Sequence, residues 1–200
     1  MPTGHPGGLA PTASCTVLVG NPKPHSRTRA VVLRTTALLA ERLSGHGVVL
    51  SEPAVVDLIE LPAGSLLPPA GANGDRPGLA GPLAAVTDAR LLLVASPTFK
   101  GTFTGLLKLF VDQLPRLALA GTVAVPVMTA AHPGHRHAVE SYLRPLLIAL
   151  GAAVPTPGLS VLEAELAALD RVLGEWLTGA VPVLGGLLPA GARDRMLTGA

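Results

Sequence analysis

Apolar residues occur along this chain in two patterns: short unbroken runs, and longer stretches in which they recur with helical spacing. The unbroken runs lie at 16–19, 89–95 and 122–128 and are rich in Val, Leu and Ala. Such runs are typical of strands that are covered on both faces, as in a parallel sheet between two layers of helices. We therefore predict buried strands at these three places.

Stretches with apolar residues three, four and seven positions apart predict helices. These helices lie at 28–43, 104–114, 136–150 and 163–177. Pro145 lies inside the third helix and should bend it, because proline removes a backbone hydrogen bond and clashes with the preceding turn.

Proline also marks the weaker strands. Pro53 interrupts 48–61, where we expect a broken or edge strand, and Pro126 inside 122–128 indicates an edge strand or a strand end. A last strand is predicted within 154–162. Because strands and helices alternate, the predicted fold class is α/β, a doubly wound five-stranded parallel sheet with helices on both faces.

Segments rich in Gly and Pro divide the rest of the chain. We expect a flexible leader at 1–14, one domain at 15–177 and a C-terminal arm or tail at 178–200. Residues 62–82 predict a long flexible connection, which either covers a ligand or is a plain surface excursion.

Composition narrows the class of protein. Hydrophobic residues make up 48% of the chain and charged residues 14%, which excludes a mainly disordered protein. No apolar stretch reaches the ~20 residues of a membrane-spanning helix, and the first residues lack the pattern of a signal peptide. A net charge of +2 without a Lys/Arg cluster argues against nucleic-acid binding. We therefore expect a cytoplasmic protein, with its single cysteine, Cys15, buried and unreactive.

The candidate chemistry lies in loops that follow the strands, because ligands of such sheets bind beyond the carboxyl ends of the strands. The first loop places Ser26, Arg27 and Thr28 at the start of a helix. Free backbone N–H groups, two hydroxyls and a guanidinium predict a phosphate site there. The alternative is that Ser26 only caps the helix.

Two further loops have unusual compositions. Residues 97–101 combine a rigid turn with an aromatic ring and Lys100. This combination suits contact with the edge of a flat heterocycle. The alternative is a plain turn with a solvated lysine. Residues 129–131 are small enough for the backbone to approach a ring.

The histidines that follow residues 129–131 lack a Cys or carboxylate pattern, so we expect no metal. Without a nucleophile elbow, a HExxH sequence or a carboxylate pair, nothing supports a hydrolase.

These loops resemble those of a known family. Residues 20–28 (GNPKPHSRT) resemble the "GSP…SRT" phosphate loop of NADPH-dependent FMN reductases, and 96–108 (SPTFKGTFTGLLK) resemble their "SPTYKGSYTGLLK" segment. Residues 142–147 resemble their helix "DYxLRPVL". The resemblance covers about 15–170 and is strongest to the branch that supplies reduced flavin to alkanesulfonate-type monooxygenases.

The resemblance implies a flavodoxin-like fold and hydride transfer from NADPH or NADH to FMN, with the reduced flavin passing to a partner monooxygenase. It also implies a homodimer or homotetramer. No side chain is expected to act as an acid or base, because the flavin carries the chemistry. The implied FMN-binding residues, from the phosphate to the two edges of the ring, are Ser26, Arg27, Thr28, Pro97, Thr98, Phe99, Lys100, Gly101, Thr129, Ala130 and Ala131.

Two alternatives stay open. One is a quinone or azo reductase with tightly bound FMN. The other is a non-catalytic flavin-binding accessory protein, which the pair Ala130-Ala131 favours because the family usually has Gly-Gly there.

Overall fold

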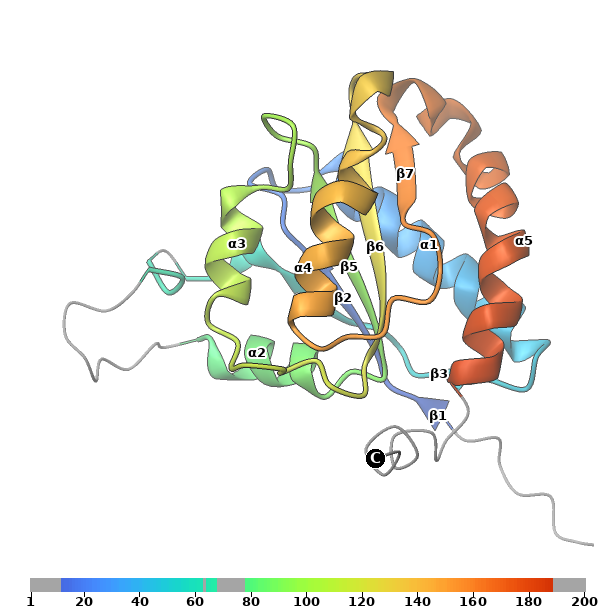
Figure 1. The fold of residues 1–200 in the computed structure, drawn as a ribbon, viewed down its shortest axis with the longest axis horizontal. Helices are drawn as coiled ribbons and strands as arrows, with labels where there is room; N and C mark the ends of the chain where they lie inside the picture. Colours follow the sequence, from blue (N-terminus) through green and yellow to red (C-terminus); the bar gives the residue numbers. More distant parts are fainter. Residues whose placement is uncertain (1–11, 63, 68–77, 189–200) are drawn as a thin grey trace, which may run out of the picture.

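A computed structural model describes residues 12–62, 64–67 and 78–188 (Figure 1). Its central sheet confirms the predicted fold class, because all five strands are parallel. In spatial order the strands are β4 (Ala54–Asp57), β2 (Cys15–Val19), β5 (Leu91–Pro97), β6 (Val123–Ala130) and β7 (Leu159–Leu162). The edge position of β4 agrees with the broken or edge strand expected at 48–61.

A separate pair of short parallel strands lies next to the amino end of β2. β1 (Thr12–Ala13) pairs with β3 (Val49–Leu50). β1 lies within the segment 1–14 that the sequence assigns to a flexible leader, and Ala13 is buried. Residues 1–11 of that segment lie outside the described part of the chain.

Helices cover both faces of the sheet. α1 (Arg27–Ser44) and α5 (Leu169–Leu187) pack on one face, while α2 (Ala80–Thr87), α3 (Gly105–Val111) and α4 (Arg144–Ala149) pack on the other (Figure 1). Successive side chains of β5 alternate between the two cores: Leu91 and Leu93 face α1 and α5, and Leu92 and Val94 face the other layer. This alternation explains why the strand is an unbroken apolar run.

The helix α2 is missing from the predicted elements. The sequence predicts a connection at 62–82, but α2 begins at Ala80 and holds Pro82 in its first turn. Proline fits there because the first N–H groups of a helix have no partner within it. Only Val86 of this short helix is fully buried, so its periodicity is weak. Residues 63 and 68–77 of the connection are outside the described ranges.

The last helix also differs from its prediction. Residues 163–177 were expected as one helix, but Glu163–Ala168 form a 3₁₀ helix and α5 then continues to Leu187. Val181 and Leu184, which the sequence assigns to a tail, are buried against the core that includes α1. Residues 178–187 of the predicted arm or tail are therefore part of α5, and residues 189–200 lie outside the described ranges. Glycines and Pro182 make this stretch look like a helix end, but its buried residues recur at helical spacing.

Pro126 lies in an inner strand, not at an edge or strand end as predicted. β6 runs between β5 and β7, and its pairing with β7 begins only at Val127. The N–H of Ala124 donates to Ala153 on that side, and backbone N–H groups of a strand alternate between its two sides. The nitrogen of Pro126 therefore faces the gap before the β7 ladder, where the missing N–H costs no ladder bond.

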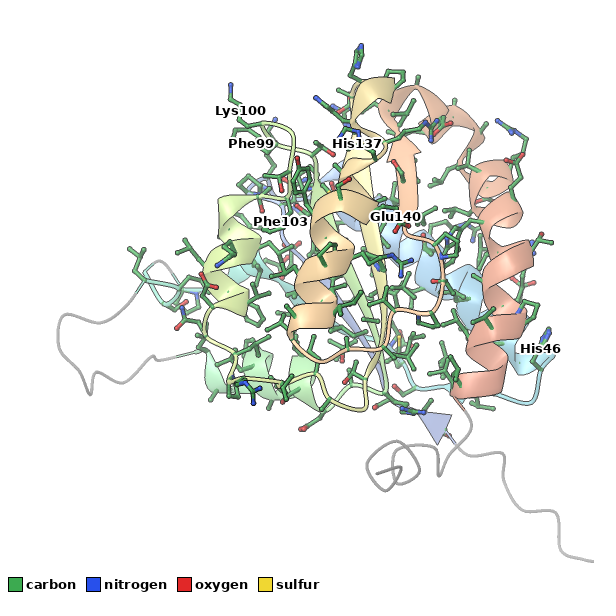
Figure 2. The ribbon with its side chains drawn as sticks, viewed as in Figure 1. His46, Phe99, Lys100, Phe103, His137 and Glu140 are labelled. Carbon is green, nitrogen blue, oxygen red and sulfur yellow. The ribbon has the colours of Figure 1, made fainter. Side chains whose placement is uncertain are left out.

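The expected bend at Pro145 takes the form of a π-helical turn, Val139–Leu143, directly before α4. Glu140 from this turn accepts hydrogen bonds from Arg144 and from the N–H of Gly158, and Arg144 donates to the carbonyls of Val154 and Thr156. Figure 2 labels Glu140 where these segments meet. The contacts tie the chain that enters β7 to the helix and so hold the amino end of β7 in place.

None of the helices within the described ranges is both long and apolar enough to cross a membrane.

Candidate functional site

The candidate site is a pocket of about 370 Å³ at the carboxyl ends of the strands. It opens beside β2 and β5, where the strand order reverses, which is the usual ligand position in such sheets. Its volume falls within the range of small-molecule sites, roughly 300–1,000 Å³. The lining residues come from four segments: 21–28, 97–99, Thr129, and the end of β7 with the turn after it.

The N-terminus of α1 forms one wall of the pocket. Ser26 is the N-cap, and its hydroxyl accepts a hydrogen bond from the N–H of Arg29 at 3.2 Å. The N–H groups of Arg27 and Thr28 donate to no other residue in the described ranges. Two free N–H groups and the positive end of the helix dipole favour an anion at this wall. Ser26 is therefore both a cap and part of a possible anion site, and the two readings of the sequence do not exclude each other.

Lys23 and His25 add positive or ionisable groups to the same wall. His25 has a φ of 49°, in the left-handed region that residues other than glycine rarely occupy. Such backbone strain persists only where surrounding contacts hold it, and it is often found at binding sites.

A buried hydrogen-bond network lies beneath this loop. The amide of Asn21 donates to Thr28 Oγ1 at 3.0 Å, and Thr28 Oγ1 lies 2.7 Å from Thr129 Oγ1. The Oδ1 atom of Asn21 accepts from the N–H of Lys23. The network joins the loop after β2, the start of α1 and the end of β6. The Thr28 hydroxyl is thus already engaged, while its N–H stays free for a ligand.

The loop after β5 forms the opposite rim. The N–H of Thr98 donates to the carbonyl of Thr129 at 2.7 Å, but the Thr98 hydroxyl is buried without a hydrogen-bond partner. A hydrogen bond to a ligand or water would stabilise the protein here, because a buried polar atom without a partner lowers the free energy of unfolding. Phe99 is 59% exposed beside it.

Lys100 and Gly101 lie at the tip of this loop, outside the pocket lining. Phe99 and Thr102 close a tight turn around them, in which both residues have positive φ, 52° and 87°. Figure 2 shows Lys100 and Phe99 at the outer end of the loop, with Phe103 deeper, between α3 and α4.

Ala130 and Ala131 also lie outside the lining of the pocket. Ala130 is the last residue of β6, pairs with Leu162 and is 2% exposed, whereas Ala131 is exposed. The structure thus brings seven of the eleven implied FMN-binding residues to the pocket wall: Ser26, Arg27, Thr28, Pro97, Thr98, Phe99 and Thr129.

Three lining residues, Val161, Glu163 and Leu166, come from a segment in which the sequence predicted no site at all. They lie at the end of β7 and in the turn after it. The sequence could have predicted them, because ligands of such sheets bind beyond the carboxyl ends of the strands and the predicted last strand ends at 162. Glu163 Oε2 accepts a hydrogen bond from Arg27 Nη1 at 2.8 Å across the pocket.

Asp57 was also not singled out. It ends β4 on the α1 side of the sheet, is 3% exposed, and lies 3.3 Å from Arg29 Nε without hydrogen-bond geometry. Burial raises the pKa of its carboxyl above the ordinary value, and the backbone of Ile59 and the charge of Arg29 offset only part of this effect. Asp57 does not line the pocket and supports the start of α1 from the side.

Cys15 lies at the opposite end of β2 from the pocket, and burial raises the pKa of its thiol to about 12. The thiol is therefore protonated and unreactive, as the sequence predicts. Within the described part of the chain, no three His, Cys, Asp or Glu side chains are grouped as metal ligands would be.

Comparison with known proteins gives a consistent result. A family model described as NADPH-dependent FMN reductase matches residues 14–165. The chain is 31% identical to an FMN reductase (NADPH) of Pseudomonas putida, over 74% of this chain and 70% of that protein. It is 40% identical to the NADH-dependent FMN reductase SfnF of Pseudomonas fluorescens, over 70% and 72%.

Solved structures agree with the fold. An apo NADH:FMN oxidoreductase (EMOB) superimposes with a TM-score of 0.75 at 28% identity, covering 89% of this chain and 91% of that one. A WrbA-like flavodoxin from Agrobacterium tumefaciens, at 15% identity and a TM-score of 0.54, covers 88% of this chain and 99% of that one, and it shows the shared fold alone.

Proposed function

Because this chain belongs to the NADPH-dependent FMN reductase family, we propose that it transfers a hydride from NADPH or NADH to FMN. The observation that carries the proposal is the pocket at the start of α1. Its free N–H groups on Arg27 and Thr28, and the guanidinium of Arg27, suit a phosphate monoester.

The other end of the pocket suits the flavin ring. The buried, unpartnered hydroxyl of Thr98 can donate to a polar atom, and the exposed ring of Phe99 offers an apolar surface beside it. In the proposal, the loop 97–101 lies along the ring and ribityl chain, with Pro97, Thr98 and Phe99 at the pocket wall. The segment 129–131 follows the other edge of the ring, with Thr129 at the wall.

FMN supplies the redox chemistry when it is bound. The protein binds the phosphate, orients the ring and keeps water from one side of it. In the proposal no side chain acts as an acid or base in the hydride step, and the carboxylate of Glu163, which lines the pocket, is paired with Arg27.

The finer parts of the proposal concern partners. We infer that the flavin is exchangeable and that reduced FMN leaves for a separate monooxygenase in the cytoplasm. We also infer a homodimer or homotetramer. Leu109, Tyr142 and Ile148, on the α3 and α4 side, expose apolar surface that a second copy can cover. The molar mass in solution, measured by light scattering, tests the assembly.

Steady-state oxidation of NADPH and NADH, with and without added FMN, tests the function. An exchangeable flavin predicts a rate that rises with added FMN and saturates. Oxidation without added flavin by a yellow protein would instead identify a quinone or azo reductase with bound FMN. If the protein binds FMN but oxidises neither NADPH nor NADH, it would instead be a non-catalytic flavin-binding accessory protein.

A further inference from the structure

A carboxylate faces the proposed phosphate site. Glu163 is the first residue after β7, and Arg27 is the first residue of α1. Both line the pocket, and their side chains meet at 2.8 Å. A carboxylate is unexpected where an anion is to bind, because it repels the anion and competes with it for the guanidinium.

The first turn of a 3₁₀ helix favours an acidic residue, but the cap of this helix does not need Glu163. The 3₁₀ helix that it begins is capped by Glu165, whose Oε2 accepts from the N–H of Leu162 at 2.8 Å. The described contacts of the Glu163 side chain are limited to Arg27. The ion pair is also exposed, with 65% of the Arg27 side chain and 44% of the Glu163 side chain accessible, so it contributes little to stability.

We propose that Glu163 competes with the FMN phosphate for Arg27 and thereby shortens the time for which the flavin stays bound. Without flavin, Arg27 pairs with Glu163. A bound phosphate takes over the guanidinium, and Glu163 is ready to take it back when the flavin leaves. Glu163 thus sets how strongly the pocket prefers a phosphorylated flavin. The inference rests on the proposed function, and it fits a reductase whose reduced flavin must depart.

The test compares Glu163→Gln with the unaltered protein for two ligands, FMN and riboflavin, which differ only in the phosphate. Flavin fluorescence gives the Kd values, and stopped-flow displacement gives koff. The variant should bind FMN about two- to fivefold more tightly, the size expected for an exposed ion pair, through a slower koff. The Kd for riboflavin should not change.

Asp170→Asn is the matched control. Asp170 also joins α1 to the chain after β7, through Arg34 at 2.6 Å, but neither residue lines the pocket. This control should leave both Kd values unchanged. In an Arg27→Ala background, Glu163→Gln should lose most of its effect, because the competition needs the guanidinium.

Two results would overturn the inference: an unchanged ratio of the FMN and riboflavin affinities in Glu163→Gln, whether both Kd values stay constant or fall equally, or an equal effect of Asp170→Asn. Each of these leaves the reductase function standing. Failure of the unaltered protein to bind either flavin would overturn the proposed function and this inference together.

Discussion

Arg27 is the residue on which the proposed phosphate site depends most. Its guanidinium lines the pocket at the start of α1, and its N–H is one of two left free there. A charge-assisted hydrogen bond to a phosphate is stronger than a neutral one, although exposure to solvent weakens it. The side chain therefore matters for the phosphate and not for the flavin ring.

Replacing Arg27 with Ala should raise the Kd for FMN about three- to tenfold and leave the Kd for riboflavin unchanged. Fluorescence titration measures both. Arg34→Ala is the control, because Arg34 lies two turns further along α1 and pairs with Asp170 outside the pocket. An unchanged Kd for FMN in Arg27→Ala would remove Arg27 from the phosphate site.

Thr28 illustrates a polar residue whose role only its neighbours reveal. It is 1% exposed, and its hydroxyl connects Asn21 to Thr129. Thr28→Val keeps the shape but removes the hydroxyl, which leaves two buried polar groups without this partner. We expect a loss of ~1–3 kcal/mol in the free energy of unfolding.

Urea denaturation measures this loss. Thr178→Val is the matched control, because Thr178 is exposed on α5 and its hydroxyl bonds only to the carbonyl of Gly174. Equal losses in the two variants would show that the buried network adds nothing beyond the general effect of replacing threonine by valine in a helix.

At the scale of elements, α5 shows how packing overrides local breakers. Glycines and Pro182 weaken the helix between 178 and 187, since glycine costs backbone entropy and proline a hydrogen bond. The helix continues because Ala180, Val181 and Leu184 lie on one side and fill the core against α1. Burial of apolar surface outweighs the poor local propensity.

Leu184→Ala should therefore destabilise the protein by ~2–4 kcal/mol, the usual cost of a cavity in a packed core. Val183→Ala is the control, because Val183 is 41% exposed on the same helix and should cost well under half as much. Both are measured by urea denaturation. A small loss in Leu184→Ala would support the assignment of this segment to a tail.

At the scale of the molecule, the pocket is assembled from segments that the chain order keeps far apart. Loops after β2, β5 and β7 and the end of β6 meet at one edge of the sheet, because all five strands run the same way (Figure 1). A ligand that contacts all of these segments binds only the folded protein, so its binding free energy adds to the stability of the whole domain.

FMN should accordingly raise the midpoint of thermal unfolding, and the rise should grow with FMN concentration. At a free concentration 100 times the Kd the added stability is ~2.7 kcal/mol. Differential scanning calorimetry with FMN measures the shift, and AMP serves as the control that carries a phosphate without a flavin. Equal shifts with both ligands would show that the pocket recognises phosphate alone.

Much of this arrangement could be read from neighbouring residues in the sequence. The buried strands were predictable from their unbroken apolar runs, and the place of Ser26, Arg27 and Thr28 at a helix start beside a strand end was predictable from the loop sequence. These features depend on local hydrogen bonding, hydrophobic period and charge, which residues a few positions apart determine.

Only the tertiary structure decided which distant side chains meet. Glu163 faces Arg27, and Thr129 reaches Thr28, because the order of the strands places β6 and β7 beside the start of α1. The course of α5 beyond 177 likewise follows from the core that it fills, not from its own propensity. Contacts between segments more than a hundred residues apart depend on sheet order and packing, and no local pattern encodes them.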